Sequence, residues 1–357
     1  MLRIAFLLVI ILHGLIHFMG FAKAFGLAEL EQLTLPISRS KGIWWLLAAI
    51  FILVSAALFF IRNSWWWLPG IVGVIVSQVL IILYWQDAKW GTIPNVLLLA
   101  VAISGWGGWA FQRSVRTDLS SFWGPADQAV NHAKMAALPA PVRQWMAVAG
   151  VTDQQTLQNV QIWQQGKMRT TPNGKWMAFE TRQWFGVRQP AFLWYAQVGG
   201  NSPMQLSGKD KLLNGQGHML IKLFSLLSIV DAKGPEIDQG TQVRYLAEII
   251  WFPAVALEDF IQWEALDEAR AKAKLRAGNQ SVDGIFFFNS DGKVIAFEAD
   301  RHYQRDGEST LETWHIDIDA ESYRSFRGIS VPTRAKVSWL LKEGAFTWLE
   351  LEIVNLE

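Results

Sequence analysis

Two charged residues one helical turn apart stand out in the apolar stretch RYLAEIIWFPAV, residues 244–255. In a helix, Arg244 and Glu248 share one face, where a guanidinium and a carboxylate can form an i, i+4 ion pair. Apolar side chains cover the rest of the circumference, so the helix must be buried or must cover an apolar surface. We interpret the pair as structural. Direct contact with a polar head group and general acid–base catalysis are the alternatives.

Two histidines near the N-terminus have the same spacing. His13 and His17, in the sequence HGLIHFMG, lie in an uncharged apolar stretch long enough to cross a bilayer, and Gln78 is a polar residue of a later apolar stretch. Ionisable groups are costly inside a membrane, so they are candidates for function. We expect hydrogen bonds between helices here. Contact with a ligand or cofactor and a redox metal are the alternatives.

A third group of metal-ligating residue types is spread over two segments, with Asp300 and His302 in one and His315, Asp317 and Asp319 in the other. Residues at alternate positions of a strand share a face, but no pattern in the sequence brings the two segments together. The chain has no Cys, and it shows no phosphate-binding loop and no nucleophile-elbow serine. We therefore predict no metal, no cofactor and no catalytic residue, and we favour a protein that is not an enzyme.

Four long stretches without Asp, Glu, Lys or Arg dominate the first 112 residues. Each is long enough to cross a hydrocarbon core of roughly 30 Å, and tryptophans at their ends match the preference of indole for the interface. We predict a domain of four transmembrane helices at residues 1–112. The stretches are Ile4–Ala22, Gly42–Ile61, Asn63–Gln86 and Trp90–Gln112.

A different pattern follows a linker and a short helix at residues 113–150. Short runs of aromatic and β-branched residues, separated by Gly, Asn, Asp or Pro, predict a mainly antiparallel β (α+β) domain at residues 151–357. Hairpin turns are expected at Asn289–Gly292 and Lys342–Ala345. One helix, expected at residues 241–259, interrupts the strands.

Small and basic residues alternate strictly in DEARAKAKLRAG, residues 267–278. This alternation favours a strand over the helix that propensity alone suggests, with the small residues facing inward and the basic residues outward. Small inward residues on one strand and large aromatic residues on others suit a curved sheet around an internal cavity. We therefore expect a curved sheet or half-barrel over the 241–259 helix.

The chain is close to neutral, with 32 Lys plus Arg against 31 Asp plus Glu. A nucleic-acid-binding protein would be expected to present a basic face, and no run of Lys or Arg indicates one. We therefore expect no nucleic-acid partner. The positive-inside tendency leaves the orientation in the membrane open, because four Arg or Lys residues flank the predicted spans on each side.

The sequence after residue 113 resembles a bacterial domain family of unknown function, most specifically in RYLAEIIWFP at residues 244–253. The resemblance implies no activity. It implies a strand order similar to that of bacterial lipoprotein-carrier domains, an incomplete antiparallel barrel over a helix with an apolar cavity between them. The four-helix unit is a departure from this simpler architecture. Other matching positions are LPAPVRQWM (138–146), GKMR (166–169), PAFLW (190–194), GQGHM (215–219), Trp263, Arg301, Trp314, Tyr323 and Trp339.

These observations together predict a membrane-anchored binding module for an apolar or amphipathic ligand, above all a lipid, with the 241–259 helix as a lid. The alternatives are an accessory or scaffold subunit of a membrane complex, with an unknown membrane-protein partner, and an enzyme that acts on lipid. We expect a multi-pass protein of the bacterial inner membrane, in contact with the lipid bilayer, with its C-terminal domain outside the cytoplasm. The predicted ligand-binding residues are Arg244, Tyr245, Glu248, Trp251, Phe252, Trp194 and His218.

Overall fold

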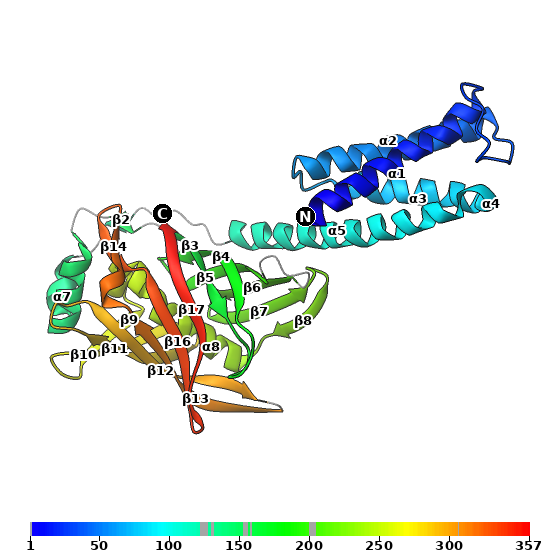
Figure 1. The fold of residues 1–357 in the computed structure, drawn as a ribbon. Coiled ribbons are helices and arrows are strands. Elements are labelled where there is room, and N and C mark those ends of the chain that lie inside the picture. The colour runs from blue at the N-terminus through cyan, green and yellow to red at the C-terminus, as the bar shows by residue number, and fades with distance from the viewer. Residues whose placement is uncertain are drawn as a thin grey trace. The chain divides into compact units, whose positions relative to one another are not determined.

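The computed structural model consists of two compact units, a helical unit at Met1–Arg113 and a β unit at Ser114–Glu357. It describes residues 2–121, 128–129, 132–152, 156–157, 159–199, 205–305 and 307–357. Figure 1 shows the helices of the first unit and the strongly curled sheet of the second. Each unit has its own hydrophobic core.

The helical unit has apolar helices in the stretches that the sequence predicted. Within the described part of the chain, three segments are long and apolar enough to cross a membrane, Leu2–Ala24, Arg39–Phe60 and Trp85–Ser120. The remaining apolar helix, α3, has 17 residues and stands at the short end of the roughly 17–25 that a span requires. The elements are α1 Leu2–Ala24, α2 Arg39–Phe60, α3 Trp67–Leu83, α4 Trp85–Ala88, η1 Lys89–Gly91 and α5 Thr92–Ser120.

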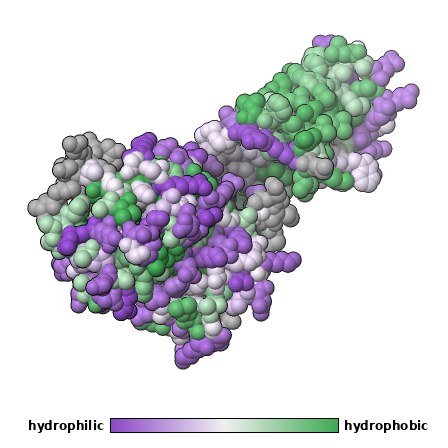
Figure 2. Space-filling view, turned by 60° about the vertical axis from the view of Figure 1, so that its left-hand side comes forward, coloured by the Kyte–Doolittle hydropathy of each residue, from purple (hydrophilic) through white to green (hydrophobic). Residues whose placement is uncertain are grey.

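The surface of the helical unit is strongly apolar. Large hydrophobic side chains are exposed along its helices, among them Leu8 at 61%, Val79 at 53% and Val96 at 62%. Figure 2 shows hydrophobic residues over most of the visible face of this unit, whereas the visible face of the β unit is mixed. Exposing an apolar surface of this extent to water is unfavourable, and a bilayer would remove that cost.

The β unit is a mainly antiparallel α+β domain, as the sequence predicted. Its large sheet has 13 strands in the order β8-β7-β6-β5-β4-β3-β17-β16-β13-β12-β11-β10-β9. Two short ribbons pair β1 (Gln128–Ala129) with β2 (Thr156–Leu157) and β14 (Tyr323–Phe326) with β15 (Ile329–Pro332). The strands of the large sheet are β3 Val160–Met168, β4 Met177–Gly186, β5 Ala191–Val198, β6 Leu206–Leu213, β7 Gln216–Leu223, β8 Leu227–Ala232, β9 Ile261–Ala265, β10 Arg270–Ala277, β11 Gln280–Phe288, β12 Val294–Arg305, β13 Glu308–Ile318, β16 Arg334–Leu341 and β17 Gly344–Leu356.

The large sheet consists of two meanders that meet in its middle. The first runs from β3 to β8 and the second from β9 to β17, and β3 pairs with β17 where they join. The helix α8 (Pro235–Glu248) lies in the chain between the edge strands β8 and β9, and it contacts β6 and β7 of one meander and β10, β11 and β12 of the other. One helix reaches both meanders because the sheet curls around it, so the architecture is a half-barrel over a helix (Figure 1).

The central helix differs in its bounds from the predicted 241–259 helix, and the prediction was wrong at both ends. The α-helix runs from Pro235 to Glu248 and is followed by two tighter 3-10 turns, η2 Ile249–Trp251 and η3 Pro253–Leu257. Pro235 lies in the first turn, where its missing N–H leaves no helical hydrogen bond unmade. At the other end Pro253 lacks the N–H that an α-helix needs, and Phe252 has left helical conformation at φ −142°.

Several local predictions are confirmed. The alternating segment forms strand β10, in which Ala271, Ala273 and Leu275 are fully buried. The two predicted turns join β11 to β12 and β16 to β17 in antiparallel hairpins. The predicted short helix is α7 (Ala140–Ala149), which ends at Gly150 in the left-handed conformation, φ 75°.

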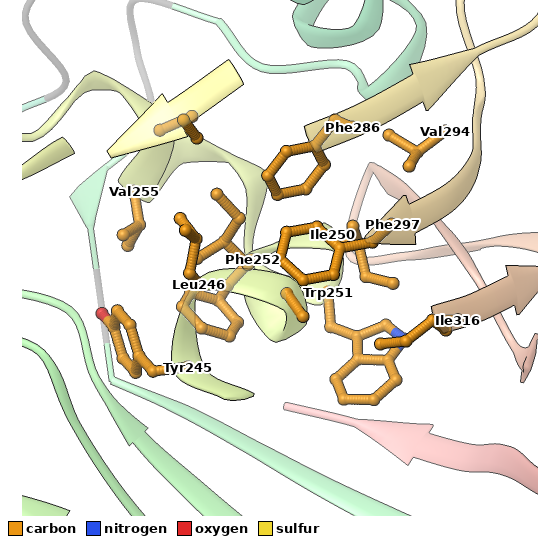
Figure 3. Packing of buried hydrophobic residues seen from close by; sticks show 14 of the residues in the cluster. Tyr245, Leu246, Ile250, Trp251, Phe252, Val255, Phe286, Val294, Phe297 and Ile316 are labelled. Carbon is orange, nitrogen blue, oxygen red and sulfur yellow. The ribbon is translucent and has the colours of Figure 1, made fainter. Parts of the chain in front are cut away.

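The main hydrophobic core lies between the central helix and the sheet. Tyr245, Leu246 and Phe252 are at most 5% exposed, and the ring centroid of Phe252 is 4.4 Å from that of Phe185 on β4. Figure 3 shows Tyr245 and Phe252 within this core and Trp251 on another side of the helix, next to Ile316. The stretch 244–255 is thus enclosed by the sheet and the rest of the core on nearly all sides, which explains why nearly all of its side chains are apolar.

Candidate functional site

A cavity of about 910 Å³ lies between α8 and the concave face of the sheet. Its volume is at the upper end of the roughly 300–1,000 Å³ that is usual for small-molecule sites. The helix and both meanders contribute to its wall, which is mostly aromatic and aliphatic. The aromatic wall residues include Phe179, Trp194, Trp251, Trp314, Trp339 and Phe346.

A buried polar cluster centred on Arg244 forms part of this wall. The Arg244 guanidinium donates through Nε to Glu248 Oε1 at 2.9 Å, through Nη1 to Asp210 Oδ2 at 2.8 Å and through Nη2 to Gln183 Oε1 at 3.2 Å. Gln183 Nε2 in turn donates to Glu248 Oε2 at 2.6 Å. Phe192 and Trp194 lie under the guanidinium, with their ring centroids 4.9 and 5.2 Å from Cζ. The predicted i, i+4 pair therefore forms, and it also ties α8 to two strands.

The register of the sheet places the cluster's strand residues together. Gln183 on β4 is opposite Trp194 on β5, and Trp194 is opposite Asp210 on β6. Residues directly opposite each other in antiparallel strands share a face, so all three point toward α8. Arg244 and Glu248, one turn apart on α8, face these three strand residues.

Burial and pairing act in opposite directions on the charged groups of the cluster. Burial raises the pKa of Glu248, although its contacts with Arg244 act the other way. Burial alone would lower the pKa of Arg244, but the attraction of Glu248 and Asp210 outweighs it, so that pKa is raised. The guanidinium is thus charged and engaged on all three nitrogens, which is the arrangement of a structural ion cluster.

A second arginine of the wall, Arg301 on β12, has different surroundings. Its Cζ lies 4.9 Å from the ring centroid of Trp314 and 5.9 Å from that of Trp339, and its Nε packs against Gly240 of α8. No carboxylate within the described residues lies within ion-pair distance of it. Burial accordingly lowers the pKa of Arg301, but an arginine remains charged near neutral pH.

The structure places four of the seven predicted ligand-binding residues in the cavity wall, namely Trp194, Arg244, Glu248 and Trp251. The other three have other surroundings. Tyr245 is buried in the core and donates its hydroxyl to Gly186 O at 2.8 Å, and Phe252 packs on Phe185. His218 Nε2 lies 2.8 Å from Asp231 Oδ1. This pair is outside the wall, because on β7 and β8 the flanking residues face the cavity.

Asp210, Gln183 and Arg301 are wall or cluster residues that sequence reasoning did not assign to the site. Asp210 and Gln183 join it through strand pairing over long sequence separations, which no local pattern reveals. Arg301 did carry a signal, since it is one of the positions that match the resembled family. The sequence did not indicate, however, that Arg301 would lie opposite the helix without a carboxylate partner.

The polar residues predicted to lie within the membrane meet in one buried network. His13 Nε2 is 2.7 Å from Asn95 Oδ1, His17 Nε2 is 2.7 Å from Ser77 Oγ, and Asn95 Nδ2 donates to Ser77 at 2.9 Å. Gln78 joins by accepting from Asn95 Nδ2 at 3.0 Å. The network connects α1, α3 and α5, which is the pattern of hydrogen bonds between helices.

The two segments considered for a metal site have local partners instead. His315 lies between Glu298 and Asp317, at 2.9 and 3.1 Å. His302 Nδ1 is 3.2 Å from Ser309 Oγ on the neighbouring strand. The contacts of His315 with Glu298 and of His302 with Ser309 join β12 to β13, and cross-strand side-chain contacts stabilise a sheet.

Comparison with known proteins places the β unit in a family. Residues 128–351 match the model of DUF6544, a family of unknown function, and no curated protein matches the chain. Among solved structures, the chain is similar to a proposed outer membrane lipoprotein-sorting protein domain from Vibrio parahaemolyticus, with 8% identity, coverage of 56% of this chain and 84% of that chain, and a TM-score of 0.30. A TM-score of this size supports no conclusion about function. Because the family model covers more than half of its residues, the chain belongs to the DUF6544 family of unknown function.

Proposed function

We propose that this protein is a membrane-anchored binding module that holds an apolar or amphipathic ligand, a lipid, in the cavity of its β unit. The observation that carries the proposal is the cavity of about 910 Å³ with its mostly apolar wall. Each Å² of apolar ligand surface removed from water contributes about 25 cal/mol, so an acyl chain would be held without any specific polar contact. A scaffold subunit that only contacts other proteins would not need an internal apolar cavity.

The central helix acts in this proposal as a fixed plug. Tyr245 bonds to Gly186 of β4, Arg244 bonds to strands β4 and β6, and Trp251 Nε1 donates to Pro332 O at 3.2 Å. The bonds of Tyr245 and Arg244 hold the helix on the large sheet, and the bond of Trp251 ties the following turn η2 to the short β14–β15 ribbon. The ligand would therefore lie beside a rigid helix, between it and the aromatic wall.

The buried polar cluster bears on the enzyme alternative. A general acid or base needs an atom free to exchange a proton with a substrate. Both oxygens of Glu248 are engaged, by Arg244 and by Gln183, and every nitrogen of the Arg244 side chain donates to a neighbour. We therefore assign the cluster a structural role and favour binding over catalysis.

Membrane anchoring is the second part of the proposal. It is supported by three helices long and apolar enough to cross a membrane and by the exposed apolar surface of the helical unit. We propose the bacterial inner membrane as the location, with the β unit outside the cytoplasm, because the strand order implied by the family resemblance is similar to that of lipid carriers that work outside the cytoplasm. Alkaline phosphatase and a fluorescent protein, fused separately to the C-terminus, test on which side of the membrane the β unit lies. Fluorescence without phosphatase activity would place the β unit in the cytoplasm.

Ligand retention by the full chain tests the binding proposal. The protein is extracted in a mild detergent, exchanged into a second detergent, and analysed by native mass spectrometry and by lipid extraction. We expect a retained apolar ligand in the wild-type protein. Ala232→Phe, which adds a ring at a wall residue of β8, should reduce it, whereas Ser228→Phe, at an exposed position of the same strand, should not.

A wild-type protein without retained ligand would contradict the proposal. So would equal retention in both phenylalanine variants, because the ligand would then lie outside the cavity. Either result would favour the accessory-subunit alternative. Co-purification of another membrane protein in stoichiometric amount would support the accessory-subunit alternative directly.

A further inference from the structure

The charges of the cavity wall are unbalanced. Among the described residues, three carboxylates line it, those of Asp210, Glu236 and Glu248. Five cationic side chains of the described part of the chain line it as well, so the described wall carries an excess of positive charge in a largely apolar space. The cationic wall residues are Arg169, Lys209, Lys233, Arg244 and Arg301.

Most of these cations already have partners. Arg244 is engaged by the cluster, and Lys209 Nζ donates to Asp118 Oδ2 at 2.6 Å. Arg169 donates to the carbonyl oxygens of Thr347 and Pro172. Lys233 is exposed to solvent at the start of the helix. Each of these four charged groups therefore already has hydrogen-bond acceptors or solvent around it.

Arg301 is the exception in the wall. Its guanidinium is held on the faces of Trp314 and Trp339, and no hydrogen-bond acceptor for it is found among the described residues. A guanidinium presents five N–H donors and binds carboxylate or phosphate in a bidentate manner. Holding such a group in an apolar cavity without an acceptor is unfavourable for folding, and unfavourable features of this kind concentrate at functional sites.

We propose that Arg301 binds the anionic head group, carboxylate or phosphate, of an amphipathic ligand whose apolar chain occupies the aromatic part of the cavity. This inference rests on the proposed function and adds the chemical class of the ligand. Trp314 and Trp339 position the guanidinium by stacking, and they also form the first part of the apolar wall. Arg244, which sequence analysis considered for this contact, holds the helix instead.

Competition between a charged and a neutral ligand with the same chain tests the proposal. The full chain in detergent is offered palmitate and 1-hexadecanol together at mildly alkaline pH, and native mass spectrometry measures the bound fraction of each. We expect the wild-type protein to prefer palmitate. Arg301→Gln should weaken palmitate binding by about tenfold or more, the loss expected for a charge-assisted hydrogen bond, and should leave 1-hexadecanol within about twofold. Arg301→Lys, which keeps the charge, should restore part of the preference.

Arg305→Gln is the matched control, since Arg305 is on the same strand but pairs with Glu343 and Glu312 away from the wall. Inorganic phosphate in excess should not displace palmitate if the chain and the head group are both recognised; displacement would show a site for free anions. Equal binding of both probes in wild type and Arg301→Gln would overturn the head-group assignment and leave the proposed function intact. Binding of neither probe to the wild-type protein would overturn the proposed function itself.

Discussion

Arg244→Ala should strongly destabilise the β unit, because Arg244 is the common partner of two buried carboxylates. The side chains of Asp210 and Glu248 are 2% and 9% exposed. Without the guanidinium, Asp210 loses the donor to Oδ2, and its Oδ1 already has no hydrogen-bond partner among the described residues. Of its bonds with described residues, Glu248 keeps the one from Gln183.

The expected loss in the free energy of unfolding follows from this geometry. Removing one partner of a buried ion pair costs about 3–5 kcal/mol, a large part of the roughly 5–15 kcal/mol that stabilises a domain. The matched control is Arg270→Ala, which removes an i, i+3 pair with Asp267 whose side chains are 48% and 41% exposed. An exposed pair contributes about 1 kcal/mol or less.

The loss should also depend on pH. Burial already raises the pKa of Glu248, and removal of Arg244 raises it further. A group whose folded-state pKa lies above its unfolded value stabilises the fold fully below the unfolded value and loses this contribution as pH rises through the folded value. Arg244→Ala should therefore be least destabilising, relative to wild type, at acidic pH and most destabilising near neutrality.

Pulse proteolysis of the full chain over a urea series, in a fixed mild detergent, measures these differences on the fragment of the β unit. The midpoints for wild type, Arg244→Ala and Arg270→Ala are compared at acidic and neutral pH. A loss for Arg244→Ala as small as that for Arg270→Ala would refute the reasoning. So would a loss that does not change with pH, since the carboxylates would then not be buried.

Three further predictions concern other contacts. Trp251→Ala should lower the free energy of unfolding of the β unit by about 3 kcal/mol, as expected for a buried aromatic residue, and should also reduce the ligand retained in native mass spectra. Full retention of ligand by the folded variant would count against the cavity as the binding site. Tyr245→Phe leaves Gly186 O without its donor and should cost roughly 1–3 kcal/mol in pulse proteolysis with ligand retention unchanged, so ligand loss in a folded protein would contradict the placement of Tyr245 outside the wall. His17→Ala removes the contact with Ser77 and should lower the stability of the helical unit by about 1 kcal/mol in detergent-titrated unfolding; an unchanged stability would argue against a role in joining helices.

Much of the fold was readable from the sequence because its signals are local. The alternation in Arg270–Ala277 outweighed helix propensity, and the strand buries its small side chains. The spacing of Arg244 and Glu248 predicted the ion pair that forms. The uncharged stretches of the first 112 residues predicted helices at the places where they occur.

The start of the central helix was not readable, because contacts from another hairpin stabilise it. The polar sequence PEIDQG fell outside the predicted helix, yet Asp238 Oδ1 accepts from Gly217 N at 2.6 Å and Gln242 Nε2 donates to Gly215 O at 2.9 Å. These bonds satisfy polar groups that favour non-helical structure in isolation. Tertiary contacts therefore outweighed local preference.

The polar residues of the site were hidden for a related reason. Gln183 and Asp210 reach Arg244 only through the register of β4, β5 and β6, which depends on pairing across the whole first meander. The difference between Arg244 and Arg301 is likewise invisible in sequence. In the fold both guanidinium groups lie against two aromatic rings, and only the positions of the carboxylates distinguish the engaged arginine from the other.

Photocrosslinking in cells tests the central claim most directly. A fatty acid carrying a diazirine is supplied to cells that produce the full chain, and after irradiation the adducts are mapped by peptide mass spectrometry. The proposed function predicts adducts on cavity-wall residues such as Trp194, Met219 and Trp339, reduced in Ala232→Phe and retained in Ser228→Phe. Adducts confined to the helical unit, with none in the β unit, would contradict it.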